Sequence, residues 1–352
     1  MNARVFTLIL LTWAATAFAA ESRFSMDWKR LDPLPNAAGV AAPFVGVSGG
    51  ALIVAGGANF PERKPWEGGT KAWHDDVFVL EQPTGRWKRA GQLPRQLAYG
   101  VSVTHGDELI CVGGSDAQRH YAEVFALSFR NDQLVVRTLP SLPFPVANAC
   151  GVMLNDTLYI TGGIAKPDAT NALTNFFALR LNERELIWRE LPSWPGTPRM
   201  LAMAAVQDNA LFIVGGVELV QTNSGASARR YLRDAYRFDP ERGWRSIAAL
   251  PFALAAAPSP APLAMNAGFF ILGGDDGSRA AIAPSSTHPG FNDQVLFYDT
   301  KRDAWSRVGT APAPRVTVPN VLWRDHWIVP SGEMRPGVRS PEIWSLKIRD
   351  EK

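Results

Sequence analysis

The chain has 352 residues, of which 46% are hydrophobic and 20% charged, and its formal net charge is +3. This balance is typical of a folded protein and excludes an intrinsically disordered one. No run of lysine and arginine alternates with aromatic residues, so we expect no nucleic acid partner. The length is large for one ordinary domain, which makes internal repeats the first feature to look for.

The first residues have the pattern of an export signal. Arg4 supplies a positive start, residues 5–17 are mostly apolar, and Ala17-Phe18-Ala19 is a cleavage pattern. A membrane anchor is the alternative, but the apolar stretch is shorter than the roughly 20 residues that span a bilayer. We therefore predict a signal peptide at 1–19, a single domain at 20–352, and a mature protein that is periplasmic and not held in a membrane.

Glycine pairs recur along the chain, each at the end of a short apolar strand. Their spacing of about 50 residues is the period of kelch-type β-propellers, in which each repeat forms one four-stranded blade. A closed ring of blades is one cooperative body, so the whole chain can be a single domain. We predict an all-β, six-bladed propeller. The six positions, the last of them degenerate, are Gly56-Gly57, Gly113-Gly114, Gly162-Gly163, Gly215-Gly216, Gly273-Gly274 and Ser331-Gly332.

Each repeat predicts four strands in the same order. In the second repeat a small, apolar first strand covers 98–103, and a tight turn leads to an apolar second strand at 109–112 that ends at the glycines. A third strand follows at 123–127, and a fourth closes the blade before Leu139-Pro140. Most fourth strands open with a tryptophan, which we expect to pack between neighbouring blades. These tryptophans are Trp87, Trp188, Trp244 and Trp305.

The two ends of the chain share the sixth blade. The last repeat has a second strand at 323–329 and a third at 341–346, and then it stops. The missing fourth strand, with its tryptophan and its Leu-Pro, lies at 28–35. We predict that the N-terminus completes the sixth blade and closes the ring, which leaves no exposed sheet edge at the seam.

Cys111 and Cys150 are the two cysteines of the sequence. An oxidising compartment permits a disulfide between them. However, Cys111 lies in an apolar strand just before a glycine pair, and Cys150 lies in the first strand of the next repeat. We predict two buried, unpaired thiols, and neither has a neighbouring histidine that would suggest a nucleophile.

The long loops gather on one face of the predicted ring. Strands alternate in direction within a blade, so loops after second strands and loops after fourth strands open on the same side. The longest loops, at 58–75, 217–234 and 275–293, all follow second strands. Long loops above a rigid frame predict a binding face. Polar residues expected there are Asn59, Asp116, Glu218, Asp275, Asp276 and Glu333 after the glycines, and Arg95, Arg199 and Arg315 before first strands.

The sixth repeat departs from the others after its degenerate glycine pair. Glu333 follows the second strand directly, and Arg339 comes shortly after a turn at Pro336-Gly337. Such a turn can bring the carboxylate and the guanidinium to one pocket. From the residues alone, an ion pair that holds the loop is the simpler interpretation.

Four segments resemble the N-acetylneuraminate epimerase family of periplasmic kelch propellers, which are also called sialate mutarotases. They are 332–339, 55–60, 98–102 and 291–293. The Glu-x-x-Pro-Gly-x-Arg pattern is the most specific of them. In the best-known members the segment like 332–339 lies mid-chain, ahead of the segment like 55–60, whereas here it comes last. The chain therefore resembles a cyclically permuted branch, and a ring tolerates permutation because neighbouring blades stay neighbours.

The resemblance implies a catalytic pair and a substrate. The family's implicated glutamate and arginine map onto Glu333 and Arg339, and the implied reaction interconverts the α and β anomers of N-acetylneuraminate. Glu333 would act as the general acid and base, and Arg339 would hold the substrate carboxylate. Arg199 and Arg315 are second choices for that carboxylate, and Asn59 and Tyr99 are candidates for the hydroxyl and acetamido groups. The reaction implies no cofactor and no metal, and Asp275-Asp276-Gly277 has the pattern of a turn rather than a calcium loop.

Other functions stay open at the level of sequence. A non-catalytic kelch propeller that binds a glycan or a protein would have the same fold. A sialidase is disfavoured because its Ser-x-Asp-x-Gly-x-Thr-Trp boxes are missing from the sequence, and a propeller copper oxidase because the five histidines are scattered. The roles of His74 and His288, which lie in long loops, are undecided. So are the particular sialic or related ulosonic acid and the oligomeric state.

Overall fold

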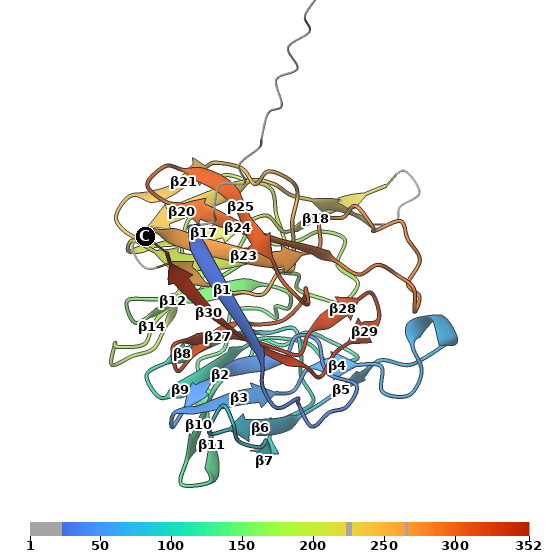
Figure 1. The fold of residues 1–352 in the computed structure, drawn as a ribbon. Coiled ribbons are helices and arrows are strands. Elements are labelled where there is room, and N and C mark those ends of the chain that lie inside the picture. The colour runs from blue at the N-terminus through green and yellow to red at the C-terminus, as the bar shows by residue number, and fades with distance from the viewer. Residues whose placement is uncertain (1–22, 223–226, 265–266, 352) are drawn as a thin grey trace, which may run out of the picture.

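The computed structural model describes residues 23–222, 227–264 and 267–351, so the predicted signal peptide lies outside the described residues. The described chain is all β apart from one 3₁₀ helix, η1 (Pro65–Glu67). Six four-stranded antiparallel sheets are arranged as blades (Figure 1), which confirms the predicted propeller. The search of these ranges for a helix that could cross a membrane finds none.

Blades 1 to 5 follow one another along the chain, and their strands pair in sequence order. Blade 1 consists of β2 (Phe44–Ser48), β3 (Ala51–Ala55), β6 (Asp76–Leu80) and β7 (Lys88–Gln92). Blade 2 consists of β8 (Val101–His105), β9 (Glu108–Val112), β10 (Val124–Arg130) and β11 (Gln133–Leu139). Blade 3 consists of β12 (Cys150–Leu154), β13 (Thr157–Thr161), β14 (Phe176–Arg180) and β15 (Trp188–Glu190). Blade 4 is β16 (Met203–Gln207), β17 (Ala210–Val214), β20 (Ala235–Asp239) and β21 (Gly243–Ile247), and blade 5 is β22 (Leu263–Ala264), β23 (Gly268–Gly274), β24 (Asn292–Asp299) and β25 (Ala304–Thr310).

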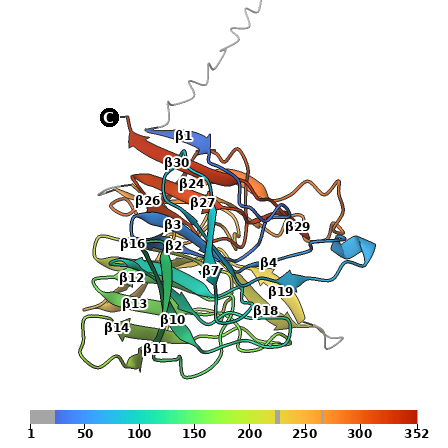
Figure 2. The same cartoon turned by 90° about the horizontal axis from the view of Figure 1, so that it is seen from below.

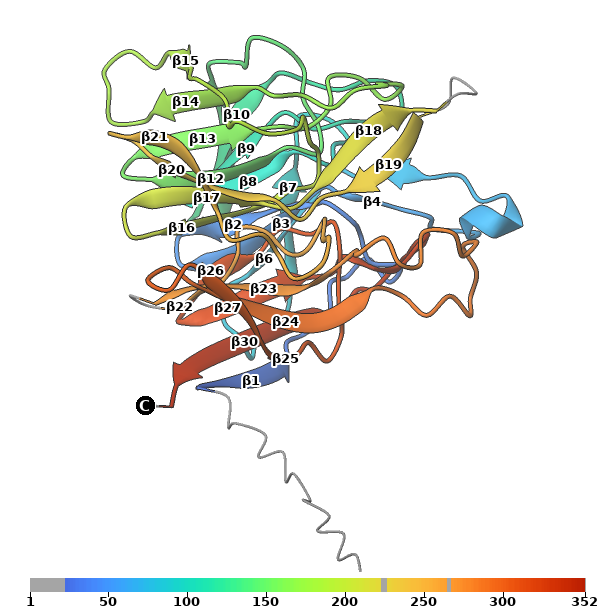
Figure 3. The same cartoon turned by 90° about the horizontal axis from the view of Figure 1, so that it is seen from above.

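Blade 6 joins the two ends of the chain, as predicted. It consists of β26 (Val321–Trp323), β27 (His326–Pro330), β30 (Ile343–Asp350) and β1 (Phe24–Arg30). β1 pairs antiparallel with β30 along its whole length, and the two strands lie side by side in all three views (Figures 1 to 3). The boundaries differ from the prediction. The fourth strand covers Phe24–Arg30 instead of 28–35, and the third covers Ile343–Asp350 instead of 341–346. Trp323 ends the first strand instead of opening the second, because the turn falls at Arg324 and Asp325, which both have positive φ.

The hydrophobic core lies between neighbouring blades, where six separate clusters of buried side chains fill the interfaces. The predicted tryptophans take part in these contacts. The indole of Trp188 in blade 3 donates a hydrogen bond of 2.8 Å to the carbonyl of Pro140, where blade 2 ends. Trp87, Trp244 and Trp305 repeat this bond to the carbonyls of Asp32, Pro192 and Ala248. Cys111 and Cys150 are buried and unpaired, as predicted.

Short hairpins extend from the ends of the blades on one side only. They are β4 (Ala58–Asn59) with β5 (Ala72–Trp73), β18 (Val217–Gln221) with β19 (Ser227–Tyr231), and β28 (Glu333–Arg335) with β29 (Val338–Arg339). β18, β19, β4 and the blue η1 loop all project to the right in Figure 3, and Figure 2 shows the same side. The predicted gathering of long loops on one face is therefore confirmed.

Every glycine pair has positive φ at both positions. The chain turns there at the end of each second strand. In the first four pairs the amide of the second glycine donates to the connection that enters the next blade, as in Gly216 to the carbonyl of Leu254. A Cβ at Gly215 would overlap that same carbonyl oxygen. Glycine is required here because both the backbone conformation and the close approach of another chain segment exclude a side chain.

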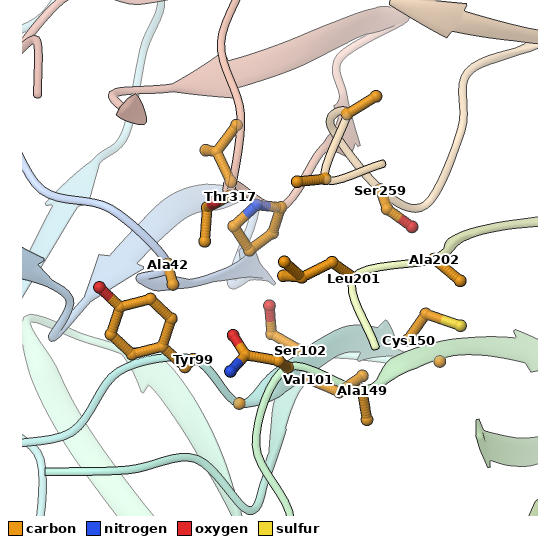
Figure 4. A pocket seen from close by; sticks show the side chains of 17 residues that line it. Ala42, Tyr99, Val101, Ser102, Ala149, Cys150, Leu201, Ala202, Ser259 and Thr317 are labelled. Carbon is orange, nitrogen blue, oxygen red and sulfur yellow. The ribbon is translucent and has the colours of Figure 1, made fainter. Parts of the chain in front are cut away.

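Six hydrogen bonds close a ring of backbone at the centre of the propeller. Where each fourth strand connects to the next blade, one non-glycine residue has φ between 50° and 64°. The amide of each such residue donates to the carbonyl of its counterpart in the previous connection, and the sixth carbonyl accepts from the first amide, over 2.7–3.1 Å. The six residues are Ala42, Tyr99, Asn148, Leu201, Ala256 and Thr317, of which Ala42, Tyr99, Leu201 and Thr317 are labelled in Figure 4.

The glycine pairs give the first testable prediction. Gly215→Ala should lower the free energy of unfolding by about 3 kcal/mol, because an L-residue at φ +59° is strained and its Cβ meets backbone. Gly106→Ala is the matched control. It has φ +57° with open space around the position and should cost only about 1 kcal/mol. Urea denaturation measures both, and equal losses would contradict the close approach as the reason for the pair.

Candidate functional site

The loop face opens into a cavity of about 550 Å³ above the central ring. Its floor includes Tyr99, Asn148, Leu201 and Thr317 of the ring, and its walls come from the loops that follow the second strands. Below the ring lies a second, much narrower space of about 80 Å³ (Figure 4). The backbone ring thus divides the centre of the propeller into an upper cavity and a lower, narrower space. A ligand of monosaccharide size fits only the upper cavity, which falls in the range of small-molecule sites.

Six equivalent positions lie around the backbone ring, one from each blade, and four of them line this cavity. Each is the residue directly after a glycine pair, and each forms an antiparallel bridge to the residue that precedes a ring position. In order they are Ala58, Ser115, Ile164, Val217, Asp275 and Glu333. The frame therefore fixes the backbone at these positions and leaves the side chain free to vary. Only two of the six carry a carboxylate.

The two carboxylates differ in whether both of their oxygens already accept hydrogen bonds. Asp275 accepts one hydrogen bond from the Tyr231 hydroxyl, at 2.7 Å, and one from the Gly277 amide, at 3.0 Å. The Gly277 bond also shows that Asp275-Asp276-Gly277 forms a turn, as predicted. Glu333 accepts the Gly337 amide at 2.8 Å through Oε1. Its Oε2 has no hydrogen-bond partner among the described residues, so Glu333 is the carboxylate with an oxygen free for a ligand.

Arg339 lies beside Glu333 because the β28–β29 hairpin pairs the two residues across its strands. Nη1 lies 3.2 Å from Oε1 of Glu333, and the guanidinium carbon lies 5.0 Å from the centre of the Phe60 ring. The side chain is only 5% exposed. Yet Nε and Nη1 have no hydrogen-bond acceptor within the described chain. The ion pair is therefore a charge contact in which no N–H points at the carboxylate, and the donors remain free.

A buried guanidinium whose N–H groups lack hydrogen-bond acceptors lowers the stability of the folded protein. Each buried donor without a partner costs about 1–3 kcal/mol, and more for a charged group. A ligand carboxylate or phosphate would satisfy two donors at once through the fork of the guanidinium. The hairpin therefore places an anion-binding group and a proton acceptor side by side on the cavity wall.

Ser331 explains why the sixth glycine pair can be degenerate. It has φ +67°, as the first glycine has in the other blades. Its hydroxyl accepts the Val40 amide at 2.7 Å and lies within hydrogen-bond distance of the carbonyls of Val40 and Ser340. These bonds compensate for the strained backbone and tie the strand that leads to Glu333 to the seam of the ring.

Tyr99 belongs to the floor of the cavity, at the boundary between the two central spaces. The ammonium of Lys71, from the long loop of blade 1, lies 4.7 Å from the Tyr99 ring and 5.1 Å from the Trp73 ring. Lys71 and Trp73 also line the cavity. The structure thus brings Glu333, Arg339 and Tyr99 together around one cavity, as predicted.

Asn59 is not part of this cavity. It is fully buried, and its amide donates to the Asn36 side chain at 3.0 Å and to the Gly39 carbonyl at 2.7 Å. Its oxygen accepts Nε2 of His74 at 2.9 Å, and burial lowers the pKa of that imidazole. The expectation that Asn59 binds a ligand is therefore replaced by a structural role, in which Asn59 and His74 fasten the long loop of blade 1 to the seam.

Arg199 and Arg315 do not line the cavity either. Arg199 is 1% exposed, forms a two-point ion pair with Asp234 at 2.6 and 3.0 Å, and donates to the Gly215 carbonyl. Arg315 is 3% exposed and pairs with Glu342 at 2.8 Å. Each acid directly precedes the third strand of its blade, so these arginines hold strands together. Neither guanidinium is available for a substrate carboxylate.

His120 lines the cavity, whereas His288, whose role the sequence left undecided, does not. His288 is buried, its Nδ1 accepts the Gly290 amide, and it is not among the residues that line the cavity. His120 does line the cavity, as do Lys71, Arg229 and the aromatic residues Phe60, Trp73 and Phe291. The sequence analysis gave none of them a role, although Phe60 and Phe291 lie in the segments 55–60 and 291–293 that carry the family resemblance. The loops have no repeated register from which the other positions could be assigned.

Comparison with known proteins identifies a family. A model of the N-acetylneuraminate epimerase family matches residues 11–136 and 139–279, which is more than half of the chain.

The chain belongs to the N-acetylneuraminate epimerase family.

Two relatives named N-acetylneuraminate epimerase match part of this family member. The protein from Haemophilus influenzae (strain 86-028NP) is 32% identical over 139 residues, which are 34% of this chain and 36% of that protein. The one from Salmonella enteritidis PT4 is 34% identical over 128 residues, 32% of this chain and 33% of that protein. The alignments therefore span about a third of each relative. The matches of the family model end at residue 279, before the hairpin that carries Glu333 and Arg339.

A solved structure supports the fold. The structure titled "Structure of YjhT" superposes with a TM-score of 0.60 at 15% sequence identity, covering 75% of this chain and 83% of that one. At this identity the similarity speaks for the propeller architecture of the epimerase family, and the chemistry must be argued from the cavity.

The structural role of Arg199 can be tested in this family member. Arg199→Met should lower the free energy of unfolding by about 3 kcal/mol at neutral pH, because it leaves Asp234 without its partner. Burial by itself would raise the pKa of Asp234, but hydrogen bonds from Arg199 and Tyr236 hold it below its usual value. The stability from this pair is therefore present above the unfolded pKa of about 3.9 and is lost as the pH falls through the lower folded-state pKa.

Urea denaturation at several pH values measures this loss. The difference between wild type and Arg199→Met should shrink towards acid pH. Lys166→Met is the control, because its partner Asp168 is as exposed as the lysine itself and such a pair contributes less than about 1 kcal/mol. A difference that grows towards acid pH would refute the assignment of Arg199 to the frame.

Proposed function

We propose that the chain is an isomerase that interconverts the α and β anomers of N-acetylneuraminate. One observation carries the proposal: a buried arginine with unsatisfied donors lies 3.2 Å from a glutamate in a cavity of monosaccharide size. Membership of the N-acetylneuraminate epimerase family gives the class of substrate. A purely structural ion pair would be expected to use the donors of the arginine within the protein.

The chemistry of the substrate limits the mechanism. N-acetylneuraminate is a 2-keto sugar acid whose anomeric carbon carries a carboxylate and no hydrogen. Inversion at that carbon cannot proceed by removal of a C–H proton. The ring must open to the ketone and close on its other face, so one proton leaves the anomeric hydroxyl while another reaches the ring oxygen, and closure reverses both transfers.

The residues of the hairpin fit these two requirements. Arg339 binds the substrate carboxylate through its free N–H groups, and this contact fixes the anomeric carbon next to Glu333. Glu333 exchanges a proton with the anomeric hydroxyl through Oε2, while Oε1 stays anchored by the Gly337 amide. Tyr99 provides a flat apolar floor for the sugar. The reaction moves protons alone, so these roles call for neither a metal nor a redox cofactor.

We also propose that the reaction takes place in the periplasm. The support is the export pattern of Arg4, the apolar stretch and Ala17-Phe18-Ala19. An exported isomerase would act on free sugar before uptake. Detection of the mature protein in an osmotic-shock fraction, with Ala20 as its first residue, tests the location and the cleavage point.

Glu333→Gln tests the proton transfer. It should lower kcat on the order of 10²–10⁴-fold, because the amide keeps the shape of the side chain but cannot take up a proton. Exchange between the anomer signals of N-acetylneuraminate in an NMR experiment measures the rate. Glu62→Gln, an exposed acid in the blade 1 loop, is the control and should behave like the wild type. A wild-type rate equal to that in buffer would refute the enzyme and leave a sugar-binding propeller.

Arg339→Met tests the anion site separately. The loss of charged hydrogen bonds to the carboxylate should raise KM roughly tenfold to a hundredfold. Binding titrations with N-acetylneuraminate and with its 1-methyl ester check the cause. Arg339→Met should weaken binding of the acid but hardly affect the ester, and an equal loss for both ligands would remove the carboxylate from the Arg339 site.

A further inference from the structure

The cavity wall holds a second group that can transfer protons, His120. It lies in the loop of blade 2 that follows Gly113-Gly114, and its backbone bridges to Ser115, one of the six equivalent positions. The side chain is 7% exposed and lines the cavity. Neither the hairpin of blade 6 nor the ion pair within it involves this residue.

The hydrogen bonds of His120 fix its tautomer. Nδ1 lies 3.1 Å from the carbonyl oxygen of Ile164. Since a carbonyl only accepts, Nδ1 carries the hydrogen and Nε2 of the neutral ring presents a lone pair. Nε2 has no hydrogen-bond partner in the described part of the chain. The imidazole is thus held in place by one nitrogen while the other remains available to a ligand.

The position of His120 follows from the six-fold arrangement. Its anchor, Ile164, is the equivalent position of blade 3. In a ring of six blades, blade 3 lies opposite blade 6, which supplies Glu333 and Arg339. His120 belongs to the loop of blade 2 and bonds to blade 3, so it lies at the boundary of these two blades and faces Glu333 across the cavity of about 550 Å³.

We infer that His120 is the second acid–base group of the isomerase, acting on the ring oxygen while Glu333 acts on the anomeric hydroxyl. This inference rests on the proposed function. Arg339 holds the carboxylate, and the hydroxyl on the same carbon lies towards Glu333. The ring oxygen is bonded to that carbon as well and points away from Glu333, towards the wall that carries His120. One group on each side of the anomeric carbon can thus serve both of its oxygens.

One proton, shared between Glu333 and His120, is enough to balance the reaction. Oε2 of Glu333 takes the hydroxyl proton, the bond between the anomeric carbon and the ring oxygen breaks, and its electron pair goes to the ring oxygen, which takes a proton from Nε2 of His120. Rotation about the bond next to the ketone presents its other face. The ring oxygen then attacks, His120 recovers its proton, and Glu333 returns its proton to the former carbonyl oxygen. Nothing is oxidised or consumed.

The surroundings of His120 determine the pH dependence. Desolvation lowers the pKa of the imidazole, while the Ile164 carbonyl and the charge of Asp116 in the same loop partly oppose this. The protonated imidazole therefore becomes scarce as the pH rises through a pKa below 6.5. The value of kcat/KM should decrease above that pKa, and the decrease should depend on His120.

His120→Gln is the decisive variant, because an amide can keep the bond to Ile164 but cannot titrate. We expect kcat to drop on the order of 10²-fold, KM to change little, and the alkaline decrease of kcat/KM to disappear. His105→Gln is the matched control. His105 ends β8 and pairs with Asp156 at the tight turns on the opposite face, so its loss should change neither the rate nor the pH profile.

A second variant separates chemistry from structure. In His120→Ala, imidazole added to the buffer should restore part of the rate, and a purely structural histidine would give no such rescue. A wild-type pH profile and rate in His120→Gln, or no rescue in a folded His120→Ala, would overturn the inference while the isomerase stands. A wild-type protein that interconverts the anomers no faster than buffer would instead overturn the proposed function, and the inference with it.

Discussion

The closed ring of six backbone hydrogen bonds is the constraint on which the rest of the molecule depends. Each donor residue has a left-handed backbone conformation that costs roughly 1–2 kcal/mol for an L-residue, and these residues include the branched Leu201 and Thr317. The ring persists because every member is held by bonds to the member before and the member after it. It also fixes how far the blades stand from the centre, and hence the width of the cavity above it.

The repeated backbone is the same in every blade, whereas the side chains that can bind or react differ between blades. At the position after each glycine pair the backbone is pinned by a bridge to the neighbouring connection, so a change of side chain there does not disturb the fold. Alanine, isoleucine and valine fill three of these positions and glutamate fills the one in blade 6. His120 faces it across the cavity from the boundary of blades 2 and 3, because its ring bonds to the carbonyl of Ile164, the equivalent position of blade 3. A rigid ring with variable positions can thus hold reacting groups at a fixed separation, which is the condition for efficient proton transfer.

A comparison of four arginines shows how their hydrogen-bond partners distinguish a structural role from a ligand-binding role. Arg95, Arg199 and Arg315 all lie in connections that enter a blade, Arg199 and Arg315 at the same position, and each pairs with an acid that directly precedes the third strand, namely Glu123, Asp234 and Glu342. Their recurrence marks them as parts of the frame. Arg339 has no counterpart in this series. It is nearly as buried as Arg315. Two of its nitrogens, Nε and Nη1, have no acceptor in the described chain, whereas Arg315 leaves only Nε unpartnered and donates through Nη1 and Nη2 to Pro314 and Glu342. Arg339 therefore keeps donors for a partner that the chain itself does not provide.

The sequence by itself determined the six blades, the strand order, the seam formed by the N-terminus, the unpaired cysteines, and the pairing of Glu333 with Arg339. These features follow from short-range patterns, since glycine pairs, alternating strands and a tight turn act within one repeat. Only the tertiary structure decided which polar residues face the cavity. Asn59 and Arg199 lie at plausible rim positions in the sequence, yet both are turned into the frame by bonds to residues far along the chain. His120 acquires its place from the carbonyl of Ile164, 44 positions away, and contacts between blades cannot be read from a single repeat.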